Sequence, residues 1–215
     1  MVGEGEEYYE IVREELKTFI KKYQDNPFDF LTEYDLQSYL YSKIFDNFEN
    51  KGVKVEIENT GNNEPIRRWK KDESPKININ PVKTEYPANY LFDIAVIDNN
   101  GLIPKPSAYW HQKLKIGIEI KYHRCSFNRI PAEIKKFKSD IEKLKKYLLD
   151  VDPQDFRGLS ILFIQNDNEK REEEFKNNRF KMDYKEVDID EIMRDRGVEG
   201  LVVTGSSCYL LIDHE

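Results

Sequence analysis

The chain has 215 residues, with 34 Lys plus Arg against 41 Asp plus Glu, so its formal net charge is −7. Hydrophobic residues make up 39% and aromatic residues 13% of the chain, which is enough apolar surface to exclude a disordered protein. No apolar run approaches the roughly 18 residues of a membrane span, and the acidic N-terminus does not resemble a secretory signal. The two cysteines exclude a disulfide scaffold, and we expect a reducing, cytoplasmic setting.

The N-terminal part of the chain predicts two helices. Residues 4–24 carry apolar side chains at helical spacing, with glutamates early and lysines late as the helix dipole favours, and Pro27 ends this helix. A second helix begins after Thr32, which can cap it, with Asp35 at the third helical position. The core stripe of this second helix consists of Leu36, Leu40, Ile44 and Phe48.

The remainder of the chain alternates between strand and helix patterns. Strands are predicted at 53–57, 82–86, 91–97, 114–121, 159–164, 201–204 and 209–212, with a long loop over 58–82. Helices are predicted at 130–149, 169–180 and 188–195. We therefore expect a single α/β domain over residues 1–215, with a central mixed β-sheet flanked by helices and an extra N-terminal helix. Its core is expected over about 30–165, followed by C-terminal helices and strands over 166–215.

Charged residues within two of the predicted strands indicate chemistry. In residues 114–121 the alternation is strict, so Glu119 and Lys121 lie on one face, about 7 Å apart. Asp93 interrupts an otherwise apolar strand, where a buried carboxylate needs a cation, a metal or several donors. If the two strands are neighbours, Asp93 and Glu119 can share one divalent metal that Lys121 also approaches. Mg²⁺ suits such a site because it prefers carboxylate oxygen and retained water.

Asp93, a gap of 25 residues and then Glu119-Ile120-Lys121 resemble the motif of the PD-(D/E)xK nuclease superfamily. The resemblance covers about residues 30–165 and implies a restriction-endonuclease-like core and a metal-dependent nuclease. It implies that Asp93, Glu119 and the carbonyl of Ile120 hold Mg²⁺ (or Mn²⁺), while Lys121 positions the attacking water and stabilises charge on the phosphate. A glutamate of the preceding helix often joins this group, and Glu33 matches it. The sequence departs from the family pattern where Phe92, and not proline, precedes the aspartate.

Further residues are candidates for the same site. Glu85 could join the acidic group as a metal ligand, and Gln37 lies one helical turn from Glu33 and could face the same cleft. Arg124, just beyond the predicted catalytic strand, could contact substrate. A basic cluster with one aromatic residue that could stack on an unpaired base consists of Arg67, Arg68, Trp69 and Lys70. A solvated loop with one anchoring aromatic is an equally good interpretation of that cluster.

Other interpretations stay open at this point. Glu119 and Lys121 could form an ordinary ion pair on a solvated sheet face, with Asp93 in a turn, and Glu33 could be a favourable charge at a helix N-terminus. The first functional rival is a nuclease fold without turnover, retained as a binding or assembly module of a defence, repair or mobile-element system. A second rival is an α/β interaction protein in which the motif is a coincidence.

The distribution of charge favours nucleic acid as the partner despite the acidic total. Residues 113–146 hold 11 Lys plus Arg and 4 Asp plus Glu, a net charge of +7. Residues 66–83 hold 6 and 2, a net charge of +4. The motif therefore lies in a basic half of the chain, and we expect salt-sensitive binding of nucleic acid, with DNA favoured over RNA. A homodimer is expected only by analogy with the fold, and no membrane partner is expected.

Overall fold

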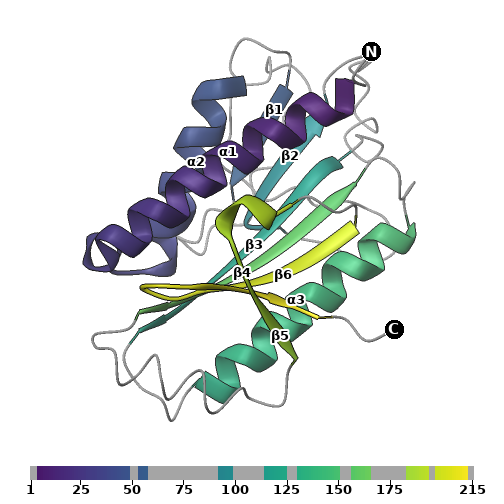
Figure 1. Cartoon of the computed structure of the whole chain (residues 1–215). Helices are drawn as coiled ribbons and strands as arrows, with labels where there is room; N and C mark the ends of the chain where they lie inside the picture. Colours follow the sequence, from purple (N-terminus) through teal and green to yellow (C-terminus); the bar gives the residue numbers. More distant parts are fainter. Residues whose placement is uncertain are drawn as a thin grey trace, which may run out of the picture.

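The computed structural model describes residues 4–48, 53–57, 92–98, 114–124, 130–150, 156–165, 183–193 and 197–212. Its helices are α1 (Glu4–Asp25), α2 (Glu33–Phe48) and α3 (Ile130–Asp150), with the short 3-10 turns η1 (Pro27–Asp29) and η4 (Ile189–Glu191). Its strands are β1 (Val53–Ile57), β2 (Ile94–Asp98), β3 (Leu114–Arg124), β4 (Arg157–Gln165), β5 (Tyr184–Val187), β6 (Gly197–Val203) and β7 (Cys208–Leu211). These strands form one sheet in the order β1-β2-β3-β4-β6-β7-β5 (Figure 1).

The sheet is mixed, and its central strands are parallel. β2 runs antiparallel to both of its neighbours, β1 and β3, whereas β3, β4 and β6 are parallel neighbours. β7 and β5 add an antiparallel edge. Parallel neighbours need a crossover connection, and α3 lies in the connection between β3 and β4. The predicted α/β class with a central mixed sheet flanked by helices is confirmed.

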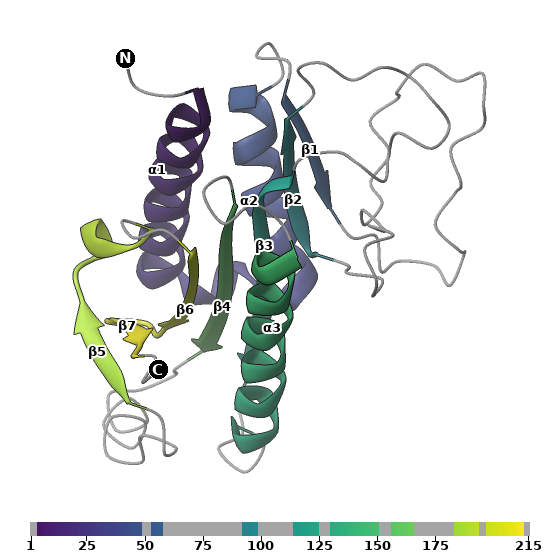
Figure 2. The same ribbon diagram turned by 90° about the vertical axis from the view of Figure 1, so that its right-hand side faces the viewer.

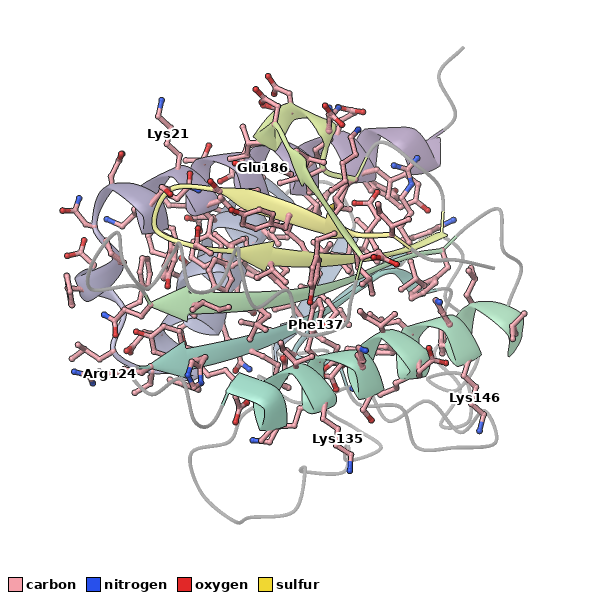
Figure 3. The ribbon with its side chains drawn as sticks, turned by 60° about the horizontal axis from the view of Figure 1, so that its bottom comes forward. Lys21, Arg124, Lys135, Phe137, Lys146 and Glu186 are labelled. Atoms are coloured by element: carbon pink, nitrogen blue, oxygen red, sulfur yellow. The ribbon has the colours of Figure 1, made fainter. Side chains whose placement is uncertain are left out.

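Helices cover both faces of the sheet. α1 and α2 lie on one face and α3 on the other (Figure 1 and Figure 2). The alternation of β3 explains this arrangement, because Ile116, Ile118 and Ile120 enter the core beneath α1 and α2. On the opposite face, Phe137 of α3 points toward the sheet while Lys135 points away from it (Figure 3). The polar side chains of β3 therefore lie under α3.

Three predicted elements differ from the structure or lie outside the described residues, and one strand of the structure was not predicted. The helix predicted at 188–195 is only the single turn η4, because the backbone of Ile192 is already extended, with φ −68° and ψ 138°. β5 was not predicted, since Tyr184 and Val187 are buried on either side of two exposed residues and the sequence shows no alternation. The strand at 82–86 and the helix at 169–180 lie outside the described residues.

None of the helices in the described part of the chain has a segment long and apolar enough to cross a membrane. The hydrophobic side chains of the three long helices instead pack on the sheet and on one another. Their buried stripes are those of helices with one face in a protein core.

Candidate active site

Asp93 reaches the site from the chain just before β2. It lies in a bend and is buried, 4% exposed, whereas the sequence predicted it within the strand. β2 pairs with β3 so that Ile94 lies opposite Ile118, and one further step brings Asp93 beside Glu119. The Oδ2 atom of Asp93 accepts a hydrogen bond of 2.6 Å from the backbone N–H of Ile120. The carboxylate is thus held by the backbone of the neighbouring strand.

Lys121 joins the residues of the predicted motif. Its Nζ atom lies 3.9 Å from Oδ2 of Asp93 and donates a hydrogen bond of 3.1 Å to the carbonyl oxygen of Ile120. The same Nζ atom is 3.6 Å from Oε1 of Glu33. One ammonium group therefore contacts two predicted acidic residues and the predicted carbonyl ligand.

Glu33 is placed by the capping structure of α2. The backbone N–H of Asp35 donates to Oγ1 of Thr32 at 3.2 Å, and Oδ2 of Asp35 accepts from the backbone N–H groups of Leu31 and Thr32. This reciprocal cap starts the helix at Glu33, where a negative charge is favourable. Oε2 of Glu33 also accepts a hydrogen bond of 3.3 Å from the backbone N–H of Tyr122. Glu33 is both a helix N-terminal charge and a neighbour of Lys121.

Two charged residues of α3 complete the group and were missed by the sequence analysis. Oδ2 of Asp140 lies 3.4 Å from Nζ of Lys121, and Lys143 forms an ion pair with Oε1 of Glu119. Asp140 could have been found, because it lies three residues after Phe137 on the apolar stripe of α3. Lys143 carried no comparable signal, since its partner depends on how α3 is rotated over the sheet.

The interpretation of Glu119 and Lys121 as an ion pair on a solvated face is wrong. Glu119 is only 3% exposed, because α3 covers this face of β3. The ion-pair partner of Glu119 is Lys143, while Lys121 contacts Glu33, Asp93 and the helix residue Asp140. The part of that interpretation that placed Asp93 in a turn is correct, although the turn is buried.

Burial and charge shift the pKa values of these groups in a consistent direction. Burial raises the pKa of Asp93 and of Glu33. Burial, and then the charge of Asp93, raise the pKa of Glu119 well above its usual range. For Lys121, burial alone would lower the pKa, but Asp93 and the other surrounding carboxylates outweigh it and raise the pKa above the usual lysine value. Lys121 is therefore a permanent cation, and the carboxylates gain from any further positive charge.

Ser160 adds a buried polar atom to this site. It lies beside Glu119 in the pairing of β3 with β4, and within the described residues its Oγ has no hydrogen-bond partner. Oε1 of Glu119 and Oδ2 of Asp140 are also buried, but each lies against a lysine ammonium. Buried polar atoms are nearly always hydrogen-bonded in proteins, so the Ser160 hydroxyl is available to a ligand at this point.

The donor atoms suit Mg²⁺ in kind and number. Asp93 and Glu119 offer carboxylate oxygens and Ile120 a carbonyl oxygen, and Mg²⁺ commonly takes one or two carboxylates and keeps several waters. In the part of the chain that the structure describes, no three His, Cys, Asp or Glu side chains converge as a ready metal-binding group. The protein would therefore supply two carboxylates and one carbonyl, with water completing the coordination.

The remaining candidates are only partly described. Arg124 is exposed at the end of β3, three residues beyond Lys121 (Figure 3). Gln37 lies on α2 one turn from Glu33 and is 2% exposed, about as buried as Glu119 and Asp93. The candidates outside the described residues are Arg67, Arg68, Trp69, Lys70 and Glu85.

No protein-family model, curated protein or solved structure matches this chain. What the site can do is therefore inferred from its own residues. Two carboxylates, a backbone carbonyl and a cationic lysine come together from β3 and the start of β2. Such a group can hold a divalent cation and stabilise an anion at the same point.

Proposed function

We propose that this protein is a metal-dependent nuclease with a restriction-endonuclease-like core, which hydrolyses phosphodiester bonds of nucleic acid, with DNA favoured over RNA. The observation that carries the proposal is the convergence of Asp93, Glu119 and Lys121. Nζ of Lys121 lies 3.9 Å from Oδ2 of Asp93. It also donates a hydrogen bond to the carbonyl oxygen of Ile120, the residue between Glu119 and Lys121. A coincidental motif does not predict that residues so far apart in sequence share one buried site.

The order of the elements supports the same proposal. A capped helix (α2) precedes three antiparallel strands (β1, β2 and β3), and a long helix (α3) then leads to a parallel strand (β4). The resemblance to the PD-(D/E)xK superfamily implies this order: a helix, strands that carry the acidic residues, a long helix and then another strand. The strands β5, β6 and β7 and the helix α1 extend this arrangement on either side of it.

Each residue of the site has a role in the proposed reaction. Asp93, Glu119 and the carbonyl of Ile120 would hold Mg²⁺ or Mn²⁺, which when bound polarises a phosphate oxygen and acidifies water. Lys121 stabilises the negative charge that grows on the phosphate, and it stays protonated because carboxylates surround it. Glu33 and Asp140 hold the Lys121 ammonium from two different helices, at 3.6 Å and 3.4 Å.

The surface around the site supports a polyanionic substrate. Arg124 is exposed at the end of β3, and exposed lysines follow along α3, among them Lys135 and Lys138. Lysine and arginine side chains supply most of the affinity of proteins for the phosphate backbone. Lys135 lies on the α3 side of the sheet (Figure 3), and Glu119 of β3 faces this side too, where it pairs with Lys143 of α3.

The decisive experiment compares wild-type protein with Lys121→Ala on single-stranded DNA, double-stranded DNA and RNA, each with Mg²⁺ or Mn²⁺. We expect the wild type to cleave and Lys121→Ala to be slower by about 10²–10³-fold, the usual loss when one charge-stabilising donor is removed. Lys21→Ala, which changes an exposed lysine of α1 on the other side of the sheet, is the control and should cleave at the wild-type rate. Equal cleavage by wild type and Lys121→Ala would reveal a contaminating nuclease and overturn the assignment.

One observation favours the alternative of a binding or assembly module without turnover. Lys143 already neutralises Glu119, and in the described residues no third metal-binding side chain joins Asp93 and Glu119. If the wild type binds DNA but cleaves none of the substrates with either metal, this alternative replaces the nuclease.

A further inference from the structure

We propose that Lys143 is an internal counter-ion of Glu119 that competes with the divalent cation for this carboxylate and so sets the metal affinity of the site. This inference rests on the proposed function, because it concerns the cation that the nuclease would use. Lys143 is thereby a positioning residue, which acts through Glu119. Its effect is read from cation binding, independently of cleavage.

The geometry that carries the inference is a pair of parallel ion pairs between β3 and α3. Glu119 and Lys121 are two residues apart on the strand, so they share one face. Asp140 and Lys143 are three residues apart on the helix, so they also share one face. The strand and the helix are therefore joined by two ion pairs. Lys143 of α3 contacts Glu119 of β3, and Nζ of Lys121 of β3 lies 3.4 Å from Oδ2 of Asp140 of α3.

The two lysines are held differently. Lys121 has a side chain that is 16% exposed and is anchored to the carbonyl of Ile120 as well as to carboxylates. Lys143 is 27% exposed, and its ammonium lies 5.5 Å from the centre of the Phe92 ring, where a cation is attracted. A lysine with the more exposed side chain can move its charged end toward water while its stem stays packed. Lys143 is thus the lysine whose ammonium group can move away from Glu119 when a metal ion binds.

Competition follows from the position of Lys143. Glu119 is buried beside Asp93, and each negative charge disfavours the other, so a cation between them is strongly favoured. Lys143 supplies one positive charge at Oε1 of Glu119, on the carboxylate that the proposed metal ion would also contact. A bound divalent cation must displace this ammonium or be repelled by it. Removing the charge of Lys143 should therefore strengthen cation binding.

The test measures Mn²⁺ binding by isothermal titration calorimetry to the wild-type chain, Lys143→Met and Lys143→Gln. We expect both neutral variants to bind Mn²⁺ about tenfold more tightly, which corresponds to about 1.4 kcal/mol. Lys146→Met, an exposed lysine one turn further along α3, should bind as the wild type does (Figure 3). Asp93→Asn combined with Lys143→Gln should lose the gain, which places the binding at this site.

Two variants keep the test decisive if one of them folds poorly. Lys143→Gln retains a hydrogen-bond donor for Glu119, and circular dichroism shows which variants are folded. Unchanged or weaker Mn²⁺ binding in the folded neutral variants, or no Mn²⁺ binding by any variant, would overturn the inference. Tighter Mn²⁺ binding without cleavage of any substrate would support the inference and contradict the nuclease, so the two failures are distinguishable.

Discussion

Ile120 shows how a single residue with an apolar side chain can organise a polar site through its backbone. Its N–H donates to Asp93 at 2.6 Å, and its carbonyl oxygen accepts from Lys121 at 3.1 Å. Its side chain meanwhile is fully buried on the opposite face of β3, beneath α1 and α2. Because strand residues alternate, the core packing of Ile120 fixes the orientation of both Glu119 and Lys121.

The raised pKa of Glu119 predicts how stability depends on pH without divalent cations. Between the usual value of 4.5 and the raised value, the folded protein binds more protons than the unfolded chain does. The free energy of unfolding therefore falls as pH rises through this window. Above the window, the destabilisation by the buried, ionised Glu119 carboxylate is fully present. We expect Glu119→Gln to be more stable than wild type by about 1 kcal/mol at pH 8, a difference that disappears near pH 4.5. Urea unfolding at several pH values measures it.

The control for this prediction is Glu142→Gln. Glu142 is exposed on the same helix that carries Lys143, so its replacement should leave the pH dependence unchanged. If the free energies of unfolding of Glu119→Gln and wild type changed in parallel from pH 4.5 to pH 8, burial would not be penalising the charge of Glu119.

At the scale of elements, α3 is the part of the fold that closes the site. Phe137 and Ile141 are buried on its stripe and pack over β4 and β6, which brings Asp140 and Lys143 over β3. Gly200 of β6 permits this approach, because a Cβ atom there would lie 3.2 Å from Cζ of Phe137 and 2.5 Å from Cδ1 of Ile141. The positions of Asp140 and Lys143 over β3 therefore depend on the apolar packing of α3 on β4 and β6.

Removing the Phe137 side chain tests that dependence. Phe137 is fully buried, and we expect Phe137→Ala to lower the free energy of unfolding by about 3–5 kcal/mol, through reduced burial and the cavity left behind. Lys135→Ala, on the outward side of the same helix, should change it by less than about 0.5 kcal/mol (Figure 3). Urea denaturation followed by circular dichroism measures both variants. A cost for Phe137→Ala as small as that of the control would mean that α3 does not pack on the sheet.

Across the whole molecule, the two faces of the sheet carry helices of opposite charge. α1 has seven acidic and four basic residues, whereas α3 has six basic and four acidic residues. The net charge of −7 therefore conceals a basic side, on which the proposed active site lies. A long polyanion would be guided to the α3 side and kept from the α1 side.

Charge reversal on each side tests this polarity. In EDTA, which prevents metal-dependent cleavage, we expect Lys135→Glu with Lys138→Glu to weaken binding of a labelled DNA duplex by about tenfold. The slope of log K against log salt should also become shallower, by about 0.9 for each phosphate that the protein no longer neutralises. Lys21→Glu, an exposed lysine of α1, is the matched control (Figure 3). Fluorescence anisotropy at several salt concentrations measures all of them, and an equally weakened affinity in the control would contradict a DNA-binding side.

Much of the fold could be predicted because its elements are strongly patterned along the chain. The cap at Thr32 and Asp35, the alternation of β3 and the stripe of α3 are all local features, and each is present in the structure. The short edge strand β5 and the single turn η4 were not predicted correctly. Both have contacts with neighbours distant in sequence, namely the pairing of β5 with β7 and the hydrogen bonds from the Arg13 side chain of α1 to the carbonyl oxygens of Asp190 and Ile192.

The sequence by itself determined the α/β class, the position of Glu119 and Lys121 on one face of a strand, and the start of a helix at Glu33. Only the tertiary structure decided which charges meet: Lys143 pairs with Glu119, and Asp140 joins Lys121. The physical reason is that an ion pair between two elements depends on strand register and on the rotation of a helix over the sheet. Those quantities are set by the packing of residues far apart in sequence, which local periodicity does not contain.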